Sequence, residues 1–242
     1  MIRVEDLTVG YGGTPLLRDL RFDVPAGDVF LILGGSGSGK STLLRHLIGL
    51  QHPMAGRVVL DSRELPGTPG GAPRFGVLFQ SGALFGSMTL AQNVALPLRR
   101  WTDLDEGTID TVVRWKLALV GLDGYENHSP AEISGGMRKR AGIARALALE
   151  PRLLFLDEPS AGLDPVTAVE LDHLLLTLNR SLGVTLVVVT HELASIFTIG
   201  RHCILLDKQA KGIVARGDPR MLRDSPPNER VASFFNRTPP KA

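Results

Sequence analysis

The sequence predicts an α/β protein built around a mostly parallel β-sheet. Three continuous apolar runs, residues 29–33, 153–156 and 184–189, are short enough to be strands that are buried on both faces of such a sheet. Helical patterns follow the first run, at residues 40–50, and separate the last two, at residues 166–182. Strands and helices that alternate at this spacing are typical of crossover connections between parallel strands.

The segments around this core add further strands and a block of helices. Residues 2–9 and 16–24 have mixed apolar and polar faces, and a glycine-rich turn separates them, so both are predicted to be strands. Residues 57–60 and 75–79 are shorter strand candidates. The pattern then changes, because apolar residues recur at helical spacing over residues 91–121, which predicts a helical insert.

Composition and charge exclude several functional classes. The 242 residues carry 27 basic and 25 acidic side chains, and the net charge of +2 argues against binding nucleic acid through bulk charge. Cys203 is the only cysteine, which excludes an internal disulfide framework and a zinc site built on several cysteines. The longest apolar runs are far shorter than the roughly 20 residues that cross a bilayer, so we expect any membrane role to come through a partner or through surface contact.

A glycine-rich loop joins the first buried strand to the helix after it. Residues 34–41 read GGSGSGKS and match the phosphate-loop pattern G-x-x-x-x-G-K-[ST] at every fixed position, in the required strand–loop–helix context. Glycine backbones can turn N–H groups toward phosphate, and the helix start adds its positive dipole end. We expect Lys40 to bridge the terminal phosphates of a nucleoside triphosphate and Ser41 to ligate Mg²⁺. The predicted phosphate-binding residues are Gly34, Gly35, Ser36, Gly37, Ser38, Gly39, Lys40, Ser41 and Thr42.

Polar residues at two other strand ends suggest the hydrolytic half of such a site. Asp157 and Glu158 end the apolar run at residues 153–156, where parallel sheets place ligand-binding groups. We expect Asp157 to hold Mg²⁺ through water and Glu158 to orient or deprotonate the attacking water. His191 follows another buried strand, from which it would donate a hydrogen bond to the terminal phosphate. Taken alone, two acids at a strand end are equally compatible with solvated side chains that have no catalytic role. Beside the phosphate loop, they predict hydrolysis of the nucleotide.

A serine–glycine–glycine motif introduces a resemblance to a known family. Residues 133–137 read ISGGM at the start of a predicted arginine-rich helix over residues 135–149. This motif closely resembles the signature of the ATP-binding cassette (ABC) ATPases, which usually reads LSGGQ. Other residues are similar to family motifs in the family's order: Tyr11 to the aromatic that stacks on adenine, Gln80 to the Q-loop glutamine, residues 160–164 to the D-loop with Asp164, and His191 to the switch histidine. The resemblance covers residues 2–219.

This resemblance implies a fold and a domain organisation. The fold is a P-loop NTPase (RecA-like) core with a mostly parallel sheet, an antiparallel β subdomain and an inserted α-helical subdomain. The chain would be one ABC ATPase domain, in which residues 1–80 and 151–220 form the nucleotide-binding core. Residues 81–150 would form the helical subdomain that carries the signature motif, and residues 221–242 a C-terminal tail.

The resemblance also implies how the site works. Two copies of the chain would pair head to tail, so that Ser134, Gly135 and Gly136 of one copy close over the ATP held by the other. Glu158, His191 and Gln80 would be the catalytic residues, and Ser41, Gln80 and Asp157 the Mg²⁺ ligands. Tyr11 and Asp164 would complete the nucleotide contacts. Met137 replaces the usual glutamine of the signature, but we still expect ATP hydrolysis, because the other motif residues and Glu158 are present.

Several stretches are similar to the ATPase subunits of Mla-type phospholipid transporters, which maintain outer-membrane lipid asymmetry in Gram-negative bacteria. They are residues 78–85, residues 93–99 and the SGGM of the signature. The resemblance implies a homodimer at the cytoplasmic face of the inner membrane, bound to a permease dimer, a mammalian-cell-entry (MCE) lipid-binding protein and a small STAS-domain subunit, with no nucleic acid. Residues 83–98 would dock on the permease, although the same apolar side chains would equally fit the core of the helical insert.

Other functions and another role for the tail stay open. An ABC importer for a small solute such as an amino acid shares every catalytic motif. An ABC ATPase that acts on ribosomes or DNA is disfavoured, because the chain has one phosphate loop and no long coiled-coil insert.

We expect the tail to be solvated, with a helix over residues 228–235. Its arginines could instead meet acidic lipid headgroups, or Val231, Phe234 and Phe235 could pack on a neighbouring subunit.

Overall fold

A computed structural model describes residues 1–61, 63–65 and 72–238. The chain divides into two compact units. The first unit comprises Met1–Pro69 and Thr185–Ala242, and the second comprises Gly70–Val184. Among the described residues, no helix combines the length and apolar character needed to cross a lipid bilayer. The expected boundaries of the helical subdomain, at residues 80 and 150, stay predictions.

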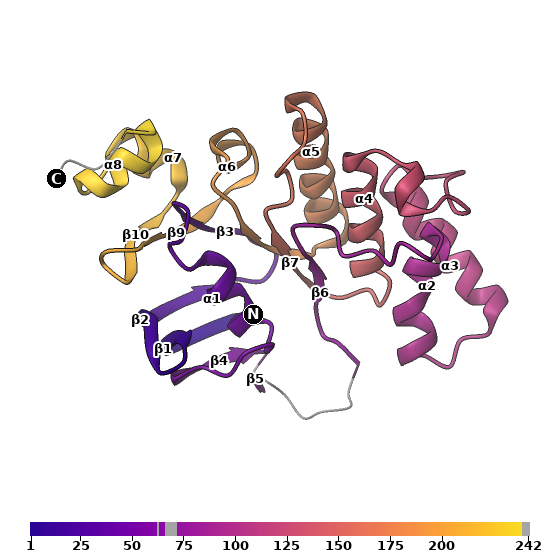
Figure 1. Ribbon diagram of the computed structural model, residues 1–242, viewed down its shortest axis with the longest axis horizontal. Coiled ribbons are helices and arrows are strands. Elements are labelled where there is room, and N and C mark those ends of the chain that lie inside the picture. The colour runs from indigo at the N-terminus through magenta and orange to yellow at the C-terminus, as the bar shows by residue number, and fades with distance from the viewer. Residues whose placement is uncertain (62, 66–71, 239–242) are drawn as a thin grey trace. The chain divides into compact units, whose positions relative to one another are not determined.

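The first unit contains an antiparallel sheet (Figure 1). Side chains along its strands alternate between one buried and one exposed face, as the mixed pattern of the first two predicted strands requires. Leu7, Leu17 and Leu20 lie in the fully buried layer. The strand order is β2-β1-β4-β5, and the strands are β1 (Ile2–Tyr11), β2 (Thr14–Val24), β4 (Ala55–Leu60) and β5 (Arg63–Leu65). The three predicted strands are confirmed, and β5 is an addition.

The first unit also contains a second group of four strands, of which three are parallel and one, β3, leads into the phosphate loop. Their order is β10-β9-β3-β8, and they are β3 (Val29–Gly34), β8 (Thr185–Val189), β9 (His202–Asp207) and β10 (Gly212–Gly217). Strand β3 pairs in parallel with β8 on one side and β9 on the other, whereas β10 runs antiparallel to β9. Every residue of β3 and β8 is buried, which explains their continuous apolar runs. The predicted parallel sheet is confirmed here.

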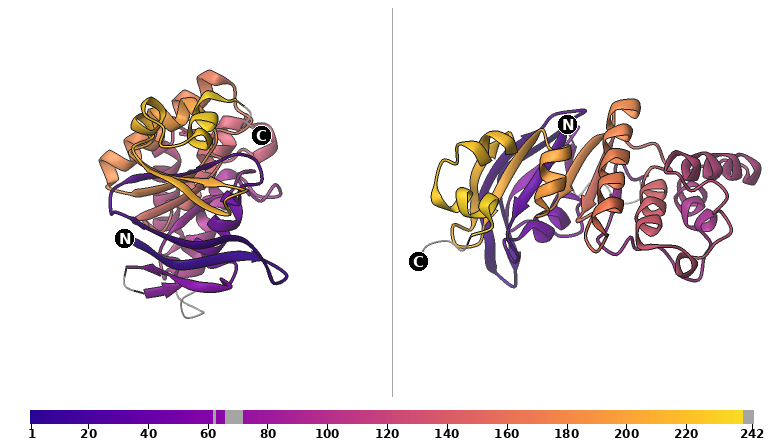
Figure 2. Two further views of the ribbon diagram at one scale, coloured as in Figure 1. Left: turned by 90° about the vertical axis from the view of Figure 1, so that its left-hand side faces the viewer. Right: turned by 90° about the horizontal axis from the view of Figure 1, so that it is seen from above.

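The second unit combines a short parallel strand pair with a group of helices. Strands β6 (Gly76–Leu78) and β7 (Leu153–Asp157) pair in parallel. Helix α2 packs against both α3 and α4, and α4 also packs against α5 and β6; Figures 1 and 2 show α2, α3 and α4 side by side. The helices are α2 (Leu90–Trp101), α3 (Glu106–Leu119), α4 (Gly135–Ala146) and α5 (Pro165–Leu182). The predicted helical insert is therefore confirmed as two helices, α2 and α3.

Most described residues of the C-terminal tail are exposed, as expected, but the tail is not free: it forms two helices, and a few of its side chains are buried against the first unit. Residues 219–236 form α7 (Pro219–Asp224) and α8 (Glu229–Asn236), which pack against β10 within the first unit (Figures 1 and 2). Val231 and Phe235, four residues apart on α8, are buried, and the Phe235 ring lies 5.8 Å from that of Phe197 in α6 (Leu193–Ile199). These two side chains pack on their own chain because the helix turns them to one face. Residues 239–242 lie outside the described part of the tail.

The single thiol yields a test of the core of the first unit. Cys203 is buried in β9, and burial raises the pKa of its thiol from 9.0 to about 12. A thiolate is the reactive species, so the folded chain holds about a thousandfold less of it than an exposed cysteine would at mildly alkaline pH. We predict that a thiol reagent labels the native chain far more slowly than the urea-denatured chain, as measured by absorbance. Labelling at equal rates would contradict this packing.

Candidate functional site

The phosphate loop requires glycine at its first position. Gly34 ends β3 with φ of 152°, and a Cβ atom there would lie 2.7 Å from the Leu206 carbonyl oxygen and would also strike the Ser38 side chain. Gly39 has φ of 94° where helix α1 (Lys40–Leu47) begins. Both values lie in the region that side chains disfavour. Side chains at these two positions would strain the backbone and strike neighbouring atoms, so the backbone cradle of residues 34–39 depends on glycine.

Lys40 folds over this cradle. Its Nζ donates to the carbonyl oxygens of Gly34 at 2.8 Å and Gly35 at 3.1 Å, which holds the ammonium group at the loop. Among the described residues, the buried Ser38 Oγ has no hydrogen-bond partner. A buried hydroxyl of this kind normally finds a partner. A polar cradle with a fixed cation and a spare hydroxyl fits a phosphate group.

Tyr11 lies at the end of β1, with its hydroxyl group tied to helix α1. The hydroxyl lies 3.1 Å from Thr42 Oγ1 and accepts a hydrogen bond from Arg45 Nη1 at 3.3 Å. These two contacts, that with Thr42 above all, lower the pKa of the Tyr11 hydroxyl. The residue remains 48% exposed, so its ring is available for a stacked ligand. This arrangement is compatible with the predicted adenine contact.

His191 lies beyond the carboxyl end of β8, in the same unit. The β3–β8 register pairs Ile32 with Val189, so the residues after Val189 leave the sheet at the edge where β3 enters the phosphate loop. His191 is exposed, and its Nε2 atom lies 3.6 Å from a carboxylate oxygen of Glu192. The sheet thus brings His191 and the phosphate loop to one edge, as predicted from parallel strands.

The second unit carries Gln80 and the two acids at the ends of its parallel strands. The β6–β7 register pairs Leu78 with Leu156, and two further steps place Gln80 opposite Glu158. Glu158 is buried and has φ of 46°, a left-handed conformation that is uncommon for a residue with a side chain. Backbone strain of this kind gathers at functional sites. Asp157 is half-buried and Gln80 is exposed.

Helix α4 contacts this site through three residues that sequence reasoning missed. Lys139 Nζ donates to the carbonyl oxygens of Gln80 at 2.5 Å and Glu158 at 3.0 Å. Arg145 donates to the carbonyl oxygen of residue 83 at 2.7 Å, and a Cβ atom on Gly142 would lie 2.6 Å from a Leu78 methyl. Their spacing of three residues puts them on one helix face. The three-residue spacing was the only feature of the sequence that could have indicated these contacts, because a sequence does not distinguish a buried lysine from an exposed one.

The start of α4 packs against the start of α5. Ser134 caps α4 by accepting the Met137 N–H at 3.2 Å. Asp164 caps α5 in the same way, and Thr167 Oγ1 donates to its carboxylate at 2.6 Å, which lowers the pKa of that carboxyl. The Thr167 methyl fills the space where a Cβ atom on Gly136 would be. The structure therefore brings the signature and the D-loop together, with Asp164 as the cap of α5.

The segment predicted to dock on a permease divides into two parts. Leu90, Val94 and Leu98 of α2 are buried, so for them the alternative that they belong to the core is the correct one. Phe85 precedes the helix and is 55% exposed, with its backbone N–H held by Asn93 Oδ1 at 2.8 Å. This part of the segment is the one that offers an apolar surface.

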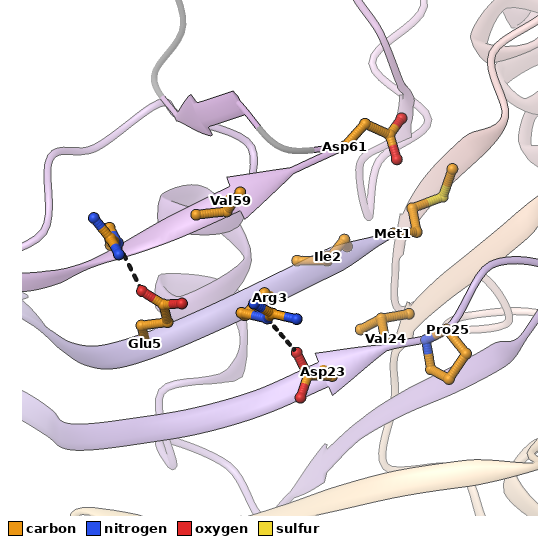
Figure 3. Close-up of a pocket in the computed structure, with 10 residues that line it drawn as sticks. Met1, Ile2, Arg3, Glu5, Asp23, Val24, Pro25, Val59 and Asp61 are labelled. Carbon is orange, nitrogen blue, oxygen red and sulfur yellow. Dashed lines mark hydrogen bonds and ion pairs between the residues drawn. The ribbon is translucent and has the colours of Figure 1, made fainter.

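A cavity of about 740 Å³ lies on the polar face of the antiparallel sheet (Figure 3). Four of its charged side chains form two ion pairs. Arg3 contacts Asp23 at 3.3 Å, and Arg57 contacts Glu5 at 2.6 Å. No residue of the phosphate loop lines this cavity, so we do not assign it to the nucleotide.

Each unit, taken by itself, carries predicted ligands whose donor atoms suit Mg²⁺. Ser41 supplies a hydroxyl group in the first unit, and Gln80 and Asp157 supply an amide and a carboxylate oxygen in the second. Mg²⁺ prefers oxygen ligands and usually binds through one or two carboxylates together with substrate phosphates and water. The chemistry of the predicted ligands therefore suits this ion.

The buried strand, glycine loop and helix with Lys40 define a P-loop nucleotide-binding protein. A family model described as "ABC transporter" matches residues 17–161, which is more than half of the chain. The chain belongs to the ABC transporter family.

Three curated relatives show the range of proteins that this chain resembles. It is 46% identical over 196 residues to the "Probable ribonucleotide transport ATP-binding protein mkl" of Mycobacterium leprae, covering 79% of this chain but only 56% of that one. It is 39% identical over 242 residues to the "Intermembrane phospholipid transport system ATP-binding protein MlaF" of Escherichia coli K12, covering 98% and 88%. It is 38% identical over 248 residues to the "Methionine import ATP-binding protein MetN" of Bradyrhizobium diazoefficiens, covering 97% and 70%.

A solved structure supports the fold. The chain superposes with a TM-score of 0.80 on the ATP-binding cassette MJ0796, described as a dimer in a post-hydrolysis state bound to ADP and Pi. The two are 28% identical, and the match covers 90% of this chain and 98% of that one. The ABC fold class predicted from the sequence is thereby confirmed.

The contact between α4 and α5 can be tested by substitution. Gly136→Ala places a methyl group against the Thr167 methyl, which cannot swing away without breaking its bond to Asp164. We predict a loss of about 1–3 kcal/mol in the free energy of unfolding, measured by urea denaturation. Adding Thr167→Ser removes the obstructing methyl, keeps the hydroxyl and should restore most of the loss.

Gly135→Ala is the matched control for this prediction. A Cβ atom at Gly135 meets nothing nearer than a Leu163 methyl at 3.6 Å, an ordinary contact. This substitution should leave the free energy of unfolding unchanged within about 0.5 kcal/mol. Equal losses from both alanines would show that the Thr167 contact is not the cause.

Proposed function

We propose that this chain is the ATP-hydrolysing subunit of a membrane transporter that moves phospholipids between the inner and outer membranes. The observation that carries the ATP part is the glycine cradle with Lys40 folded over it. The similarity to MlaF over nearly the whole chain supports the lipid part. In this proposal, residues 1–80 and 151–220 form the nucleotide-binding core, and residues 81–150 form the helical subdomain.

The first unit binds the nucleotide. Backbone N–H groups of the loop and the start of α1 face the phosphates, and Lys40 bridges the terminal two. The Tyr11 ring stacks on adenine while its hydroxyl stays tied to Thr42. Mg²⁺, when bound, neutralises phosphate charge, and Ser41, Gln80 and Asp157 are the side chains that hold it.

Hydrolysis needs one proton acceptor and one donor near the terminal phosphate. Glu158 takes a proton from the attacking water, and its burial keeps the carboxylate away from competing solvent. His191, from its position after β8, donates a hydrogen bond to a terminal phosphate oxygen. The remaining rate enhancement comes from positioning and from charge neutralisation, as in other phosphoryl transfers.

Two copies of the chain form the working unit. The helix start at Ser134, Gly135 and Gly136 is a second anion-accepting N-terminus in a chain that already has a phosphate loop, so we assign it to the nucleotide held by the other copy. Asp164 lies beside it at the cap of α5 and contributes to the same contact. The dimeric state of MJ0796 supports this arrangement.

The chain passes its motion to a permease dimer at the cytoplasmic face of the inner membrane. The exposed Phe85 segment is the docking surface that we assign to the permease. An MCE-domain lipid-binding protein and a STAS-domain subunit complete the proposed complex. Transport follows because ATP closes the dimer and hydrolysis reopens it.

A second candidate function is import of a small solute. Its support is the similarity to MetN, which is named a methionine importer and matches nearly the whole chain. The catalytic residues serve both functions equally. The two therefore differ only in the partners that the chain binds.

Replacement of the proposed base tests the chemistry. Glu158→Gln removes the proton acceptor but keeps the shape of the side chain. We predict that ATP hydrolysis falls by about 10²–10⁴-fold and that an ATP-bound dimer accumulates, as measured by phosphate release and size-exclusion chromatography. Lys40→Ala, as the comparison, should lose ATP binding itself. Turnover at the parent rate in Glu158→Gln would show that another group is the base.

The partners that co-purify distinguish the two transport functions. We predict that the chain, purified in detergent from its native membrane, brings down a permease together with an MCE-domain protein. Mass spectrometry identifies the subunits. A periplasmic solute receptor without an MCE protein would favour import of a small solute and would contradict the lipid assignment.

A further inference from the structure

The ammonium group of Lys139 lies just beyond the point where the pairing of β6 with β7 ends. The paired register ends at Leu78 and Leu156, and two further steps would place Gln80 opposite Glu158. Glu158 turns away with φ of 46°, so regular pairing stops there. The Lys139 ammonium donates to both carbonyl oxygens, at 2.5 Å and 3.0 Å. One side chain thus joins the two strand ends at the residues to which catalysis is assigned.

The burial of Lys139 shows that this contact has a cost. The residue is 6% exposed, and burial lowers the pKa of its amine, whereas the charges of Asp157 and Glu158 oppose that shift. Burying an ammonium group is unfavourable unless it is well paired. Lys116, also buried in the second unit, contacts the exposed carboxylate of Glu150 at 3.1 Å. Lys139 instead contacts backbone oxygens, whose positions set the path of the chain.

The helix that carries Lys139 is the signature helix itself. Lys139 lies little more than one turn after Gly135, where α4 begins. Arg145, on the same face, holds the carbonyl oxygens of residues 82 and 83 at 3.2 Å and 2.7 Å. Helix α4 is therefore attached to the segment after β6 at two points, Lys139 and Arg145. Its side-chain contact with Glu158 is made by Lys139.

We propose that Lys139 is a positioning residue that fixes the backbones of Gln80 and Glu158 and links them to the signature helix. The inference rests on the function proposed above for those two residues. Fixing the peptide plane of each residue fixes the direction in which its side chain leaves the backbone. A movement of α4 is thereby transmitted to the magnesium-binding glutamine and to the base together.

Kinetics of the full chain test this proposal. Lys139→Met keeps the length of the side chain and removes its donors and charge. We expect kcat for ATP to fall by about 10- to 100-fold, as for other groups that orient metal ligands. The KM for ATP should stay within about threefold of the parent value, because binding is assigned to other residues. Lys139→Gln, which keeps one donor, should give an intermediate kcat.

Lys116→Met is the matched control, because it removes a buried lysine of the same unit that does not touch the site. It should leave kcat within about twofold of the parent value even if its thermal midpoint falls. A parent-like kcat in Lys139→Met, or an equal loss in Lys116→Met, would overturn the proposal. If Lys139→Met fails to fold, the same comparison is made with Lys139→Gln.

Hydrogen exchange provides a readout that does not need turnover. The Gly82 N–H donates to Phe79 at 2.7 Å and the Ala161 N–H donates to Glu158 at 3.2 Å, in the turns that follow the two strands. We expect both amides to exchange about tenfold faster in Lys139→Met and at the parent rate in Lys116→Met. Unchanged exchange would overturn the proposal. A parent chain that binds ATP without splitting it would refute the proposed function instead, and exchange would then decide the role of Lys139.

Discussion

The hydrogen-bonded ladder on both sides of β3 is the constraint on which the first unit depends. Strand β3 is buried along its whole length between β8 and β9, so its end is fixed from two directions. Gly34 is therefore placed against the Leu206 carbonyl with no room for a side chain. The fixed end of β3 in turn positions the loop, the Lys40 ammonium group and the start of α1. A rigid strand end thus orders a loop made of glycines, which would otherwise be among the most mobile segments of a chain.

In the second unit, side chains rather than a long strand ladder fix the backbone at the ends of the parallel strands. The pair β6–β7 is short, and beyond it the register is held by Lys139 and Arg145 from α4. The start of α4 is in turn held by its close contact with Thr167, whose rotamer depends on Asp164. Each of these groups is fixed by the next, so Asp157, Glu158, Gln80 and the start of α4 form one connected assembly. This is the physical reason to treat them as a functional unit.

Much of the fold and the site could be predicted from the sequence, because buried strands and glycine loops leave strong local patterns. The runs of β3, β7 and β8, and the loop of residues 34–41, follow directly from such patterns. The roles of Lys139 and Thr167 could not be predicted, because burial and close contact are properties of the folded chain. The helix predicted over residues 228–235 is confirmed as α8, but the sequence did not show that Val231 and Phe235 are buried against their own chain. The boundaries near residues 80 and 150 left no comparable signal.

The tether on Tyr11 has a consequence for the choice of nucleotide. Its hydroxyl is already occupied by Thr42 and Arg45, so only the flat face of the ring is offered to a base. A flat π-surface makes no distinction between the hydrogen-bonding edges of different bases. If Tyr11 stacks on the base as proposed, adenine and guanine would stack on it almost equally well, and this contact alone would not discriminate ATP from GTP.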